Sequence, residues 1–270
     1  MVSFPPCKIN LGLNVIRKRS DGYHDIETCF YPVPWNDVLE VIKSESFQFT
    51  TSGILVPGSA ADNLCIKAYH TLGNDFKLDP IKIHLHKIIP MGAGLGGGSS
   101  DAAHTLLLLN EVFDLKLSPS DLQQYAARIG SDCSFFIRDL PMIGSGRGEV
   151  LRPTSVNLKG KFIVIVKPDI HVSTAEAYAG IKPGTPDVSL TSVVGLPVRE
   201  WKDKLVNDFE KTVFDKHPIV GEIKESLYNA GALYSSMSGS GSSVFGIFDL
   251  PIDLKPAFGS MTYWSGLLVV

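Results

Sequence analysis

Apolar and polar positions alternate in several short runs of the first ninety residues, a period of two that is typical of half-buried strands. The clearest run is 81–86, where isoleucine or leucine alternates with lysine or histidine. We therefore expect a strand there that turns His84 and His86 toward solvent. The same pattern predicts further strands at 8–16, 26–33, 38–42 and 47–51, the first two joined by a turn at Asp21-Gly22.

Helical patterns follow these strands and then alternate with new ones. An Ala- and Leu-rich segment ends near Phe113, and Ser118-Pro119 reads as an N-cap and first-turn proline that open a helix through Ile129. Helices are also expected from Asn63 onward and at 174–180 and 218–229, with strands at 161–167, 233–237 and 244–248. We expect two α/β domains, 1–150 and 151–270, with the active site in the cleft between them.

The segment Pro90–Ala103 lies between the strand at 81–86 and the Ala- and Leu-rich helix, and it carries five glycines in seven positions. Glycine lets the main chain adopt left-handed or crowded conformations. We expect Ser99 and Ser100 to open the helix, whose unpaired N–H groups and positive dipole end favour an anion. The segment is therefore a candidate phosphate-binding loop.

Two better-known phosphate loops fit this segment less well. Gly92, Gly94 and Gly97 have the spacing of the dinucleotide fingerprint, but 117–121 reads as the start of a helix where that fold needs a strand ending in an acid. The spacing also imitates a P-loop, but Gly98 stands where the phosphate-binding lysine is required, so any lysine must come from elsewhere. A flexible turn without a ligand is disfavoured, because unused glycines each cost roughly 0.5–1 kcal/mol of folding entropy.

Composition narrows the class of protein without identifying it. The chain has 270 residues, of which 44% are hydrophobic and 20% charged, enough to bury the core of one large or two modest domains. Its net charge of -3 does not indicate the basic surface that nucleic-acid binding requires. The four cysteines have neither C-x-x-C spacing nor a paired histidine, so we expect reduced core thiols rather than zinc ligands or disulfides. With no apolar run near ~20 residues and no cleavage motif, we expect a cytoplasmic protein.

Three segments together resemble the motifs of the GHMP family of small-molecule kinases, in the same order and at the same spacing. They are 6–11 (Pro-Cys-Lys-Ile-Asn-Leu), 90–103 and 238–242 (Ser-Gly-Ser-Gly-Ser), and the match runs over nearly the whole chain. The resemblance implies an α/β (α+β) fold of two domains. The N-terminal domain would be ribosomal-protein-S5-like and carry the ATP-binding glycine loop, and the C-terminal domain would be a ferredoxin-like α+β domain.

Four segments narrow the resemblance within the family. Lys8-Ile9-Asn10-Leu11, Asp21-Gly22-Tyr23-His24, 95–100 and Gly130-Ser131-Asp132 look like those of kinases that use ATP to phosphorylate the 2-hydroxyl of 4-diphosphocytidyl-2-C-methyl-D-erythritol in non-mevalonate isoprenoid biosynthesis. The chain departs from the pattern at Cys133-Ser134, where a Val-Pro pair is usual, and in 238–242, where threonine and alanine are common. Neither departure removes a functional group that the reaction needs.

The resemblance implies two catalytic residues, Lys8 and Asp132. Asp132 is expected to accept the proton of the acceptor hydroxyl, and Lys8 to stabilise both the aspartate and the charge that develops on the phosphoryl group. Without the resemblance, Lys8 would be read as an exposed strand-end lysine and Asp132 as a turn residue that follows a helix. The assignment therefore depends on the motifs and not on the two residues alone.

The resemblance also implies the residues that hold each substrate. For ATP these are Asn63, Lys87, Pro90, Met91, Gly92, Ala93, Gly94, Leu95, Gly96, Gly97, Gly98, Ser99 and Ser100. For the cytidyl substrate they are Tyr23, Phe30 and Tyr178 as aromatic surfaces, His24 as the cytosine-reading group, and Asn10, Thr174, Ser238, Gly239 and Ser240. No acidic pair with clear metal spacing is visible, so no metal ligand is assigned and Mg²⁺ is inferred from the reaction class alone.

Other functions fit the sequence less well. The nearest alternative is a GHMP kinase for another alcohol, such as homoserine or mevalonate, but those substrates have no base for Tyr23 and His24 to read. A nucleotide-binding oxidoreductase lacks the acidic strand end, and a non-catalytic binding module would be expected to have lost Lys8 or Asp132. We expect the cytidyl substrate and ATP as the only partners, with no nucleic acid and no membrane, and a monomer or homodimer.

Overall fold

The computed structural model describes residues 1–270 apart from the side chain of Ala60, and its contacts divide the chain into two units. Unit 1 comprises Met1–Cys7, Trp35–Met91 and Gly96–Leu140. Unit 2 comprises Lys8–Pro34, Gly92–Leu95 and Pro141–Val270. Each unit therefore draws on several segments of the chain, and the division into domains at residue 150 stays a prediction.

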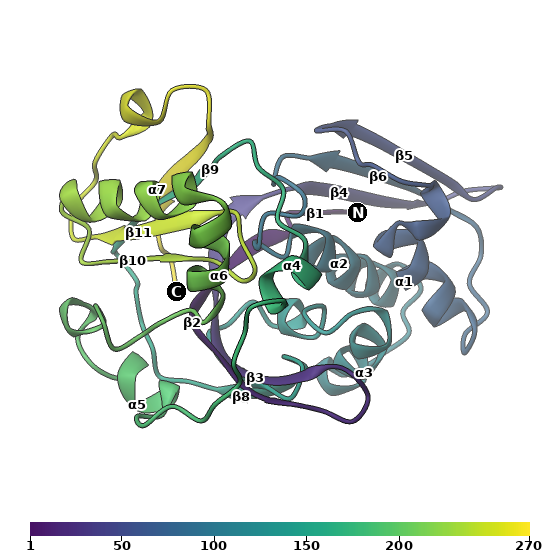
Figure 1. Cartoon of the computed structure of the whole chain (residues 1–270). Helices are drawn as coiled ribbons and strands as arrows, with labels where there is room; N and C mark the ends of the chain where they lie inside the picture. Colours follow the sequence, from purple (N-terminus) through teal and green to yellow (C-terminus); the bar gives the residue numbers. More distant parts are fainter. The chain divides into compact units, whose positions relative to one another are not determined.

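A four-stranded sheet in the order β1-β4-β6-β5 forms one layer of unit 1 (Figure 1). Its strands are β1 (Val2–Ser3), β4 (Val38–Lys43), β5 (Gln48–Gly53) and β6 (Ile81–Lys87). β6 pairs antiparallel with β4 and parallel with β5, and its alternation buries Ile81, Ile83 and Leu85 on one face. The opposite face carries His84 and His86, which are half-buried and hydrogen-bonded to hydroxyl groups of β5.

Helices form the second layer of unit 1. They are α1 (Leu64–Gly73), α2 (Gly97–Val112) and α3 (Pro119–Ile129), with the short 3-10 helices η1 (Ala60–Asp62) and η2 (Phe135–Ile137). α1 and α2 pack against each other, and α2 also packs against β4 (Figure 1). α3 begins where the sequence predicts, because Ser118 and Asp121 form a reciprocal capping box.

The helix after the glycine loop begins earlier than the sequence predicted. We expected Ser99 to open it, but α2 starts at Gly97 because Gly96 serves as the N-cap in a left-handed conformation, with φ +71°. The Ser100 N–H donates to the carbonyl of Gly96 at 3.0 Å, which closes the first helical turn. The N–H groups that precede this bond belong to Gly96, Gly97, Gly98 and Ser99, so the anion-favouring helix end lies within the glycines.

Two four-stranded sheets account for the strands of unit 2, in the orders β2-β3-β7-β8 and β10-β11-β9-β12. The first consists of β2 (Pro6–Lys18), β3 (His24–Asn36), β7 (Met142–Ser145) and β8 (Val150–Pro153) and belongs largely to this unit. The second consists of β9 (Phe162–Lys167), β10 (Tyr234–Met237), β11 (Val244–Phe248) and β12 (Thr262–Leu267), all paired antiparallel. The predicted strands therefore exist, and β2 and β3 extend further than the alternation indicated.

The helices of unit 2 are mostly short. They are α4 (Thr174–Tyr178), α5 (Leu190–Val194), α6 (Phe209–Lys216) and α7 (Pro218–Asn229), with η3 (Val198–Glu200) and η4 (Lys255–Phe258). α7 packs on β10 and β11, where Leu227 joins a buried cluster that includes Val164 and Val244 (Figure 1). α7 lies where the sequence predicts it, whereas α6 was missed because only Phe209 and Val213 are buried in its eight residues.

The cysteines behave as core side chains. Cys7, Cys29, Cys65 and Cys133 are all buried and free, as expected of core thiols. Across the residues that the structure describes, no helix combines the length and apolar character needed to cross a membrane.

Candidate active site

Lys8 lies near the start of β2 in unit 2, yet only 3% of its surface is exposed. Its Nζ donates to Asn10 Oδ1 at 2.6 Å and to the carbonyl of Gly94 at 3.0 Å. The same Nζ lies 5.4 Å from the centroid of the buried Phe30 ring. Burying an ammonium group is costly unless oxygen atoms replace its water. A buried lysine from another segment of the chain is thus held against the glycine loop, which has no lysine of its own.

The amide of Asn10 is oriented by a second hydrogen bond. Its Nδ2 donates to Thr28 Oγ1 at 2.9 Å, and that hydroxyl donates to the carbonyl of Gly12 at 2.5 Å. With Nδ2 committed to Thr28, Oδ1 is the atom that faces Lys8. Thr28 was not predicted from the sequence, because a threonine inside an alternating strand gives no functional signal.

The two glycine-serine segments of the sequence meet within unit 2. Ser238 Oγ donates to the carbonyl of Gly94 at 2.8 Å, and the N–H of Ser243 donates to the carbonyl of Ala93 at 3.2 Å. Gly94 has φ +76°, and a Cβ there would collide with the carbonyl of Ser238. Gly239 is buried in the same turn, and Ser240 beside it is half-buried. The carbonyl of Gly94 is therefore the point where both loops and Lys8 converge.

Asn207 holds the loop at 238–242 and was not predicted from the sequence. Its Nδ2 donates to the carbonyls of Met237 and Gly239, each at 2.8 Å, while its Oδ1 accepts the N–H of Phe209 at 3.0 Å. The side chain is buried, so all three bonds exchange water for protein partners. In the sequence, the only sign of this role is the pair Asn207-Asp208 before a short helix, and such a pair is also typical of an ordinary helix N-terminus.

The aromatic residues predicted to bind the cytidyl substrate lie in unit 2. The rings of His24 and Tyr178 stack at 4.5 Å with an interplanar angle of 17°, and Phe209 packs edge-on against Tyr178 at 4.7 Å. Tyr23 is 57% exposed and lies under the guanidinium of Arg147 at 5.0 Å. Thr174, the first residue of α4, is exposed. A flat ring stack beside an exposed tyrosine can accept a planar base.

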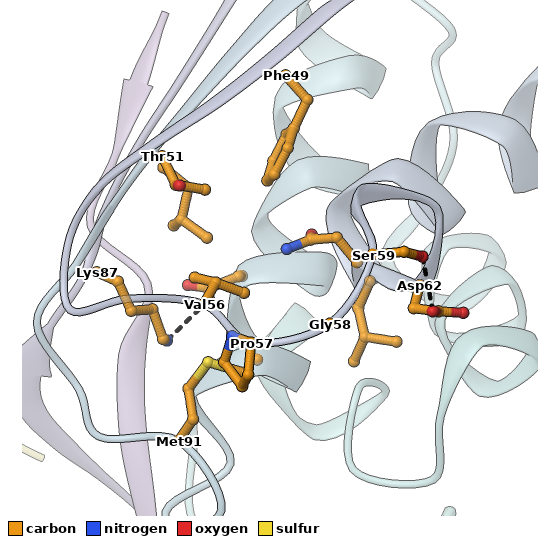
Figure 2. Close-up of a pocket in the computed structure, with 14 residues that line it drawn as sticks. Phe49, Thr51, Val56, Pro57, Gly58, Ser59, Asp62, Lys87 and Met91 are labelled. Carbon is orange, nitrogen blue, oxygen red and sulfur yellow. Dashed lines mark hydrogen bonds and ion pairs between the residues drawn. The ribbon is translucent and has the colours of Figure 1, made fainter.

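A cavity of about 320 Å³ opens in unit 1 beside the start of α2. Four of the predicted ATP residues line it: Asn63, Lys87, Met91 and Gly98 (Figure 2). Asn63 also caps α1, because its Oδ1 accepts the N–H of Cys65 at 2.9 Å. The volume is at the lower end of the range for small-molecule sites.

Lys87 reaches the cavity from β6, but its ammonium group is bound within the protein. It forms ion pairs with Asp37 and, at 2.9 Å, with Asp101, and its side chain is 1% exposed. Burial alone would lower the pKa of Lys87, but the charges of Asp101 and Asp37 raise it above its ordinary value of 10.5. Burial raises the pKa of Asp101 to about 7, against the lowering effect of Lys87.

The predicted base, Asp132, lies in unit 1 in the turn that precedes η2, where it is half-buried. Its neighbour Cys133 is linked to the first turn of α2 by a hydrogen bond with the Ser99 side chain. Burial raises the pKa of the Cys133 thiol to about 12, so this thiol is an inert hydrogen-bonding group at neutral pH. Ser99 therefore connects the turn of Asp132 with the anion-favouring end of α2.

Family models match both parts of the chain. The GHMP kinases N terminal domain matches residues 63–139, which belong to unit 1 except for Gly92–Leu95, and the GHMP kinases C terminal model matches residues 198–257, within unit 2. A Cytophaga hutchinsonii protein named 4-diphosphocytidyl-2-C-methyl-D-erythritol kinase is 52% identical over 250 residues, which is 92% of this chain and 93% of that protein.

Solved structures share the fold over almost the whole length. A crystal structure of 4-(cytidine 5'-diphospho)-2C-methyl-D-erythritol kinase matches with a TM-score of 0.81 at 30% identity and covers 98% of both chains. The mevalonate kinase of Methanococcus jannaschii matches with a TM-score of 0.69 at 12% identity, over 99% of this chain and 98% of that one, which shows the fold alone. The predicted mixed α/β fold is thereby confirmed.

Replacement of Gly94 by alanine tests the junction of the two loops. We expect Gly94→Ala to lose more unfolding free energy than Gly160→Ala, measured by urea denaturation. Both positions have positive φ, +76° and +82°, so both variants carry the strain of about 1–2 kcal/mol for a left-handed alanine. Only at Gly94 would the new Cβ also meet the backbone of Ser238. Equal losses would contradict the close approach.

The raised pKa of Asp101 predicts a pH dependence of stability. Between the ordinary value of 3.8 and about 7, the unfolded chain ionises this carboxyl while the folded chain keeps it protonated. Wild type should therefore lose unfolding free energy relative to Asp101→Asn as pH rises through this window, and the difference should level off above it. Hydrogen bonds from Tyr125 and Arg128 lower the pKa of Asp75, so as pH rises wild type should gain unfolding free energy relative to Asp75→Asn only below pH 3.8, and the difference should stay flat through the window of Asp101. A flat difference for Asp101→Asn would contradict the prediction.

Proposed function

Because this chain belongs to the GHMP kinase family, we propose that it transfers the γ-phosphoryl group of ATP to the 2-hydroxyl of 4-diphosphocytidyl-2-C-methyl-D-erythritol. The products would be the 2-phosphate and ADP, within non-mevalonate isoprenoid precursor synthesis. The identity of 52% to a kinase named for this substrate supports the choice of acceptor. We further propose a cytoplasmic monomer or homodimer.

The observation that carries the proposal is the ammonium group of Lys8, held 3.0 Å from the glycine-loop carbonyl of Gly94. Phosphoryl transfer requires little covalent chemistry from the protein, and consists mainly of positioning and charge stabilisation. A cation fixed against a loop of backbone N–H groups serves both requirements. In this proposal Lys8 stabilises the charge on the transferring phosphoryl group, while the N–H groups at the start of α2 hold the phosphates.

Asp132 is the proposed acceptor of the substrate's hydroxyl proton. It lies half-buried in a turn whose next residue is hydrogen-bonded to Ser99 of the phosphate-binding helix end. A carboxylate on a turn fixed to that helix end can be held in a constant orientation, which general base catalysis requires.

Mg²⁺ is proposed from the reaction class, and the residues present fit it to a limited extent. Ser100 Oγ, in the first turns of α2, is buried and has no hydrogen-bond partner among the described residues. Among those residues no group of three His, Cys, Asp or Glu side chains could hold a metal. The ion would therefore depend on phosphate oxygens and water, with the Ser100 hydroxyl as the protein's ligand. When bound, it would neutralise phosphate charge.

The base of the cytidyl substrate is proposed to bind at the His24 and Tyr178 rings. Stacking alone tolerates any base, so a group that reads the polar edge is also needed, and His24 supplies one. A GHMP kinase for homoserine or mevalonate is not favoured, because those substrates would leave these groups unused. The likeness to mevalonate kinase is at 12% identity and reflects the shared fold.

Acceptor specificity tests the proposal directly. We expect ATP-dependent ADP release with the cytidyl substrate and none above background with homoserine or mevalonate. His24→Ala should weaken binding of the cytidyl substrate by roughly 1–3 kcal/mol, the cost of an unsatisfied polar partner, with ATP affinity unchanged in calorimetry. His86→Ala, on the sheet of unit 1, is the matched control. Turnover of homoserine or mevalonate in preference to the cytidyl substrate would refute the proposal.

Replacement of the proposed base tests the chemical step. Asp132→Asn keeps the shape of the side chain but cannot accept the proton, so we expect turnover to fall by roughly 10²–10⁴ while both substrates still bind. Single-turnover kinetics would separate this loss from slower product release. Asp114→Asn, an exposed change in the same unit, should remain at the wild-type rate. Near-normal transfer by a folded Asp132→Asn protein would remove this residue from the mechanism.

A further inference from the structure

Asp37, which none of the proposed steps uses, lies fully buried between β3 and β4. Its Oδ1 accepts the N–H groups of Ile88 at 2.5 Å and Ile89 at 2.8 Å, and its Oδ2 binds the ammonium group of Lys87. Its own N–H donates to the carbonyl of Pro5 at 3.0 Å. A buried carboxylate is tolerated only where such donors replace water, so this arrangement is tightly specified.

The groups that Asp37 holds lead from the sheet into the cavity. β6 ends at Lys87, and the next residues run through Ile88 and Ile89 to Met91. Lys87 and Met91 both line the cavity of about 320 Å³ (Figure 2). Asp37 therefore fixes the backbone between two lining residues, although it is not itself one of them.

The same segment also supports the first turn of α2. A Cβ added to Gly97 would lie 2.9 Å from Lys87 Nζ and 3.0 Å from Cγ2 of Ile89. The ammonium group and the Ile89 side chain are thus packed directly against the first residue of the helix. Displacing either would change the packing of Gly97, which precedes the cavity-lining Gly98.

Of the two carboxylates that share Lys87, Asp37 is the better satisfied. Both of its oxygens have donors, whereas Asp101 Oδ1 is buried without a hydrogen-bond partner among the described residues. The position of the ammonium group is therefore set mainly by Asp37. Lys87 in turn binds Asp101 on α2, which extends the connection from Asp37, between β3 and β4, through β6 to the helix.

We propose that Asp37 is a positioning residue for the nucleotide: by holding Lys87 and the amides of Ile88 and Ile89, it sets the shape of the unit 1 cavity and the entry into the glycine loop. This inference rests on the proposed function, and it takes the cavity, which four of the predicted ATP residues line, as the site of the nucleoside of ATP. Asp37 touches neither substrate, so it governs nucleotide affinity and not the transfer step.

Two variants separate the charge of Asp37 from its hydrogen bonds. Asp37→Asn keeps an oxygen for the amides of Ile88 and Ile89 but loses the charge that binds Lys87, and Asp37→Ala loses both. We expect the Kd for ADP and the KM for ATP to rise about 10–100-fold in Asp37→Asn, the effect of one hydrogen bond to a charged group, and further in Asp37→Ala. The KM for the cytidyl substrate and kcat at saturating ATP should stay near wild type.

The control is a variant that loses stability but is expected to keep its affinity for nucleotide. Leu72→Ala removes a fully buried side chain of α1 in the same unit and should leave the KM for ATP unchanged. Hydrogen exchange supplies a readout that needs no nucleotide. The amides of Ile88 and Ile89 should lose protection in Asp37→Ala, and keep it in Leu72→Ala and largely in Asp37→Asn.

The outcomes distinguish this inference from the proposed function. Wild type that binds ADP, with ADP affinity unchanged in both Asp37 variants, would overturn the positioning role alone. The role would also be overturned if both substrates' KM values rose together, or if Leu72→Ala reproduced the ATP defect. Wild type that binds neither ADP nor ATP would refute the proposed function and this inference with it, even if the two amides lost protection as expected.

Discussion

The carbonyl oxygen of Gly94 ties together parts of the chain that are far apart in sequence. It accepts the ammonium of Lys8, 86 residues away, and the hydroxyl of Ser238, 144 residues away. This is possible only because Gly94 adopts a positive φ and lacks a Cβ that would collide with the Ser238 backbone. The glycines of the loop therefore provide a fixed backbone shape and not flexibility. Two buried asparagines hold the groups that meet at this carbonyl. Asn10 accepts a hydrogen bond from Lys8, and Asn207 donates one to Gly239 in the loop that contains Ser238.

Two buried lysines join different parts of the structure. Lys8 donates to an amide oxygen and a backbone carbonyl beside the glycine loop. Lys87 lies between the carboxylates of Asp37 and Asp101, so its charge is balanced within the protein. Our proposal gives the phosphoryl charge to Lys8, because it contacts the glycine loop, and the shape of the cavity to Lys87, because it lines that cavity. The predicted ATP contact of Lys87 stays a prediction.

Local patterns predicted most of the elements, because they report local physics. The alternation at 81–86 gave β6, and Ser118 with Pro119 gave the start of α3. The predicted start of α2 was wrong, because we expected a serine to open the helix and Gly96, in a left-handed conformation, is the N-cap. The motifs gave Lys8 and the glycine loop, whose roles remain proposals.

Asp37 and Asn207 could not be found from the sequence. Their partners are backbone groups about 50 and 30 residues away, and such long-range bonds leave no periodicity to read. A single aspartate between two strands, or an asparagine before a helix, is far more often a turn or cap residue. The positions of most strands and helices were thus predictable from local pattern and the fold class from the family resemblance, whereas the residues that hold the site in shape required the three-dimensional packing.

Analysis of the reaction product by ³¹P and ¹³C NMR would show which hydroxyl group receives the phosphate. After incubation with ATP, Mg²⁺ and 4-diphosphocytidyl-2-C-methyl-D-erythritol, we expect one new phosphomonoester signal coupled to carbon 2 of the methylerythritol. The cytidine diphosphate linkage should stay intact, and one ADP should form for each product molecule. A phosphate on another hydroxyl, or ADP formed without a new phosphomonoester, would contradict the proposed function.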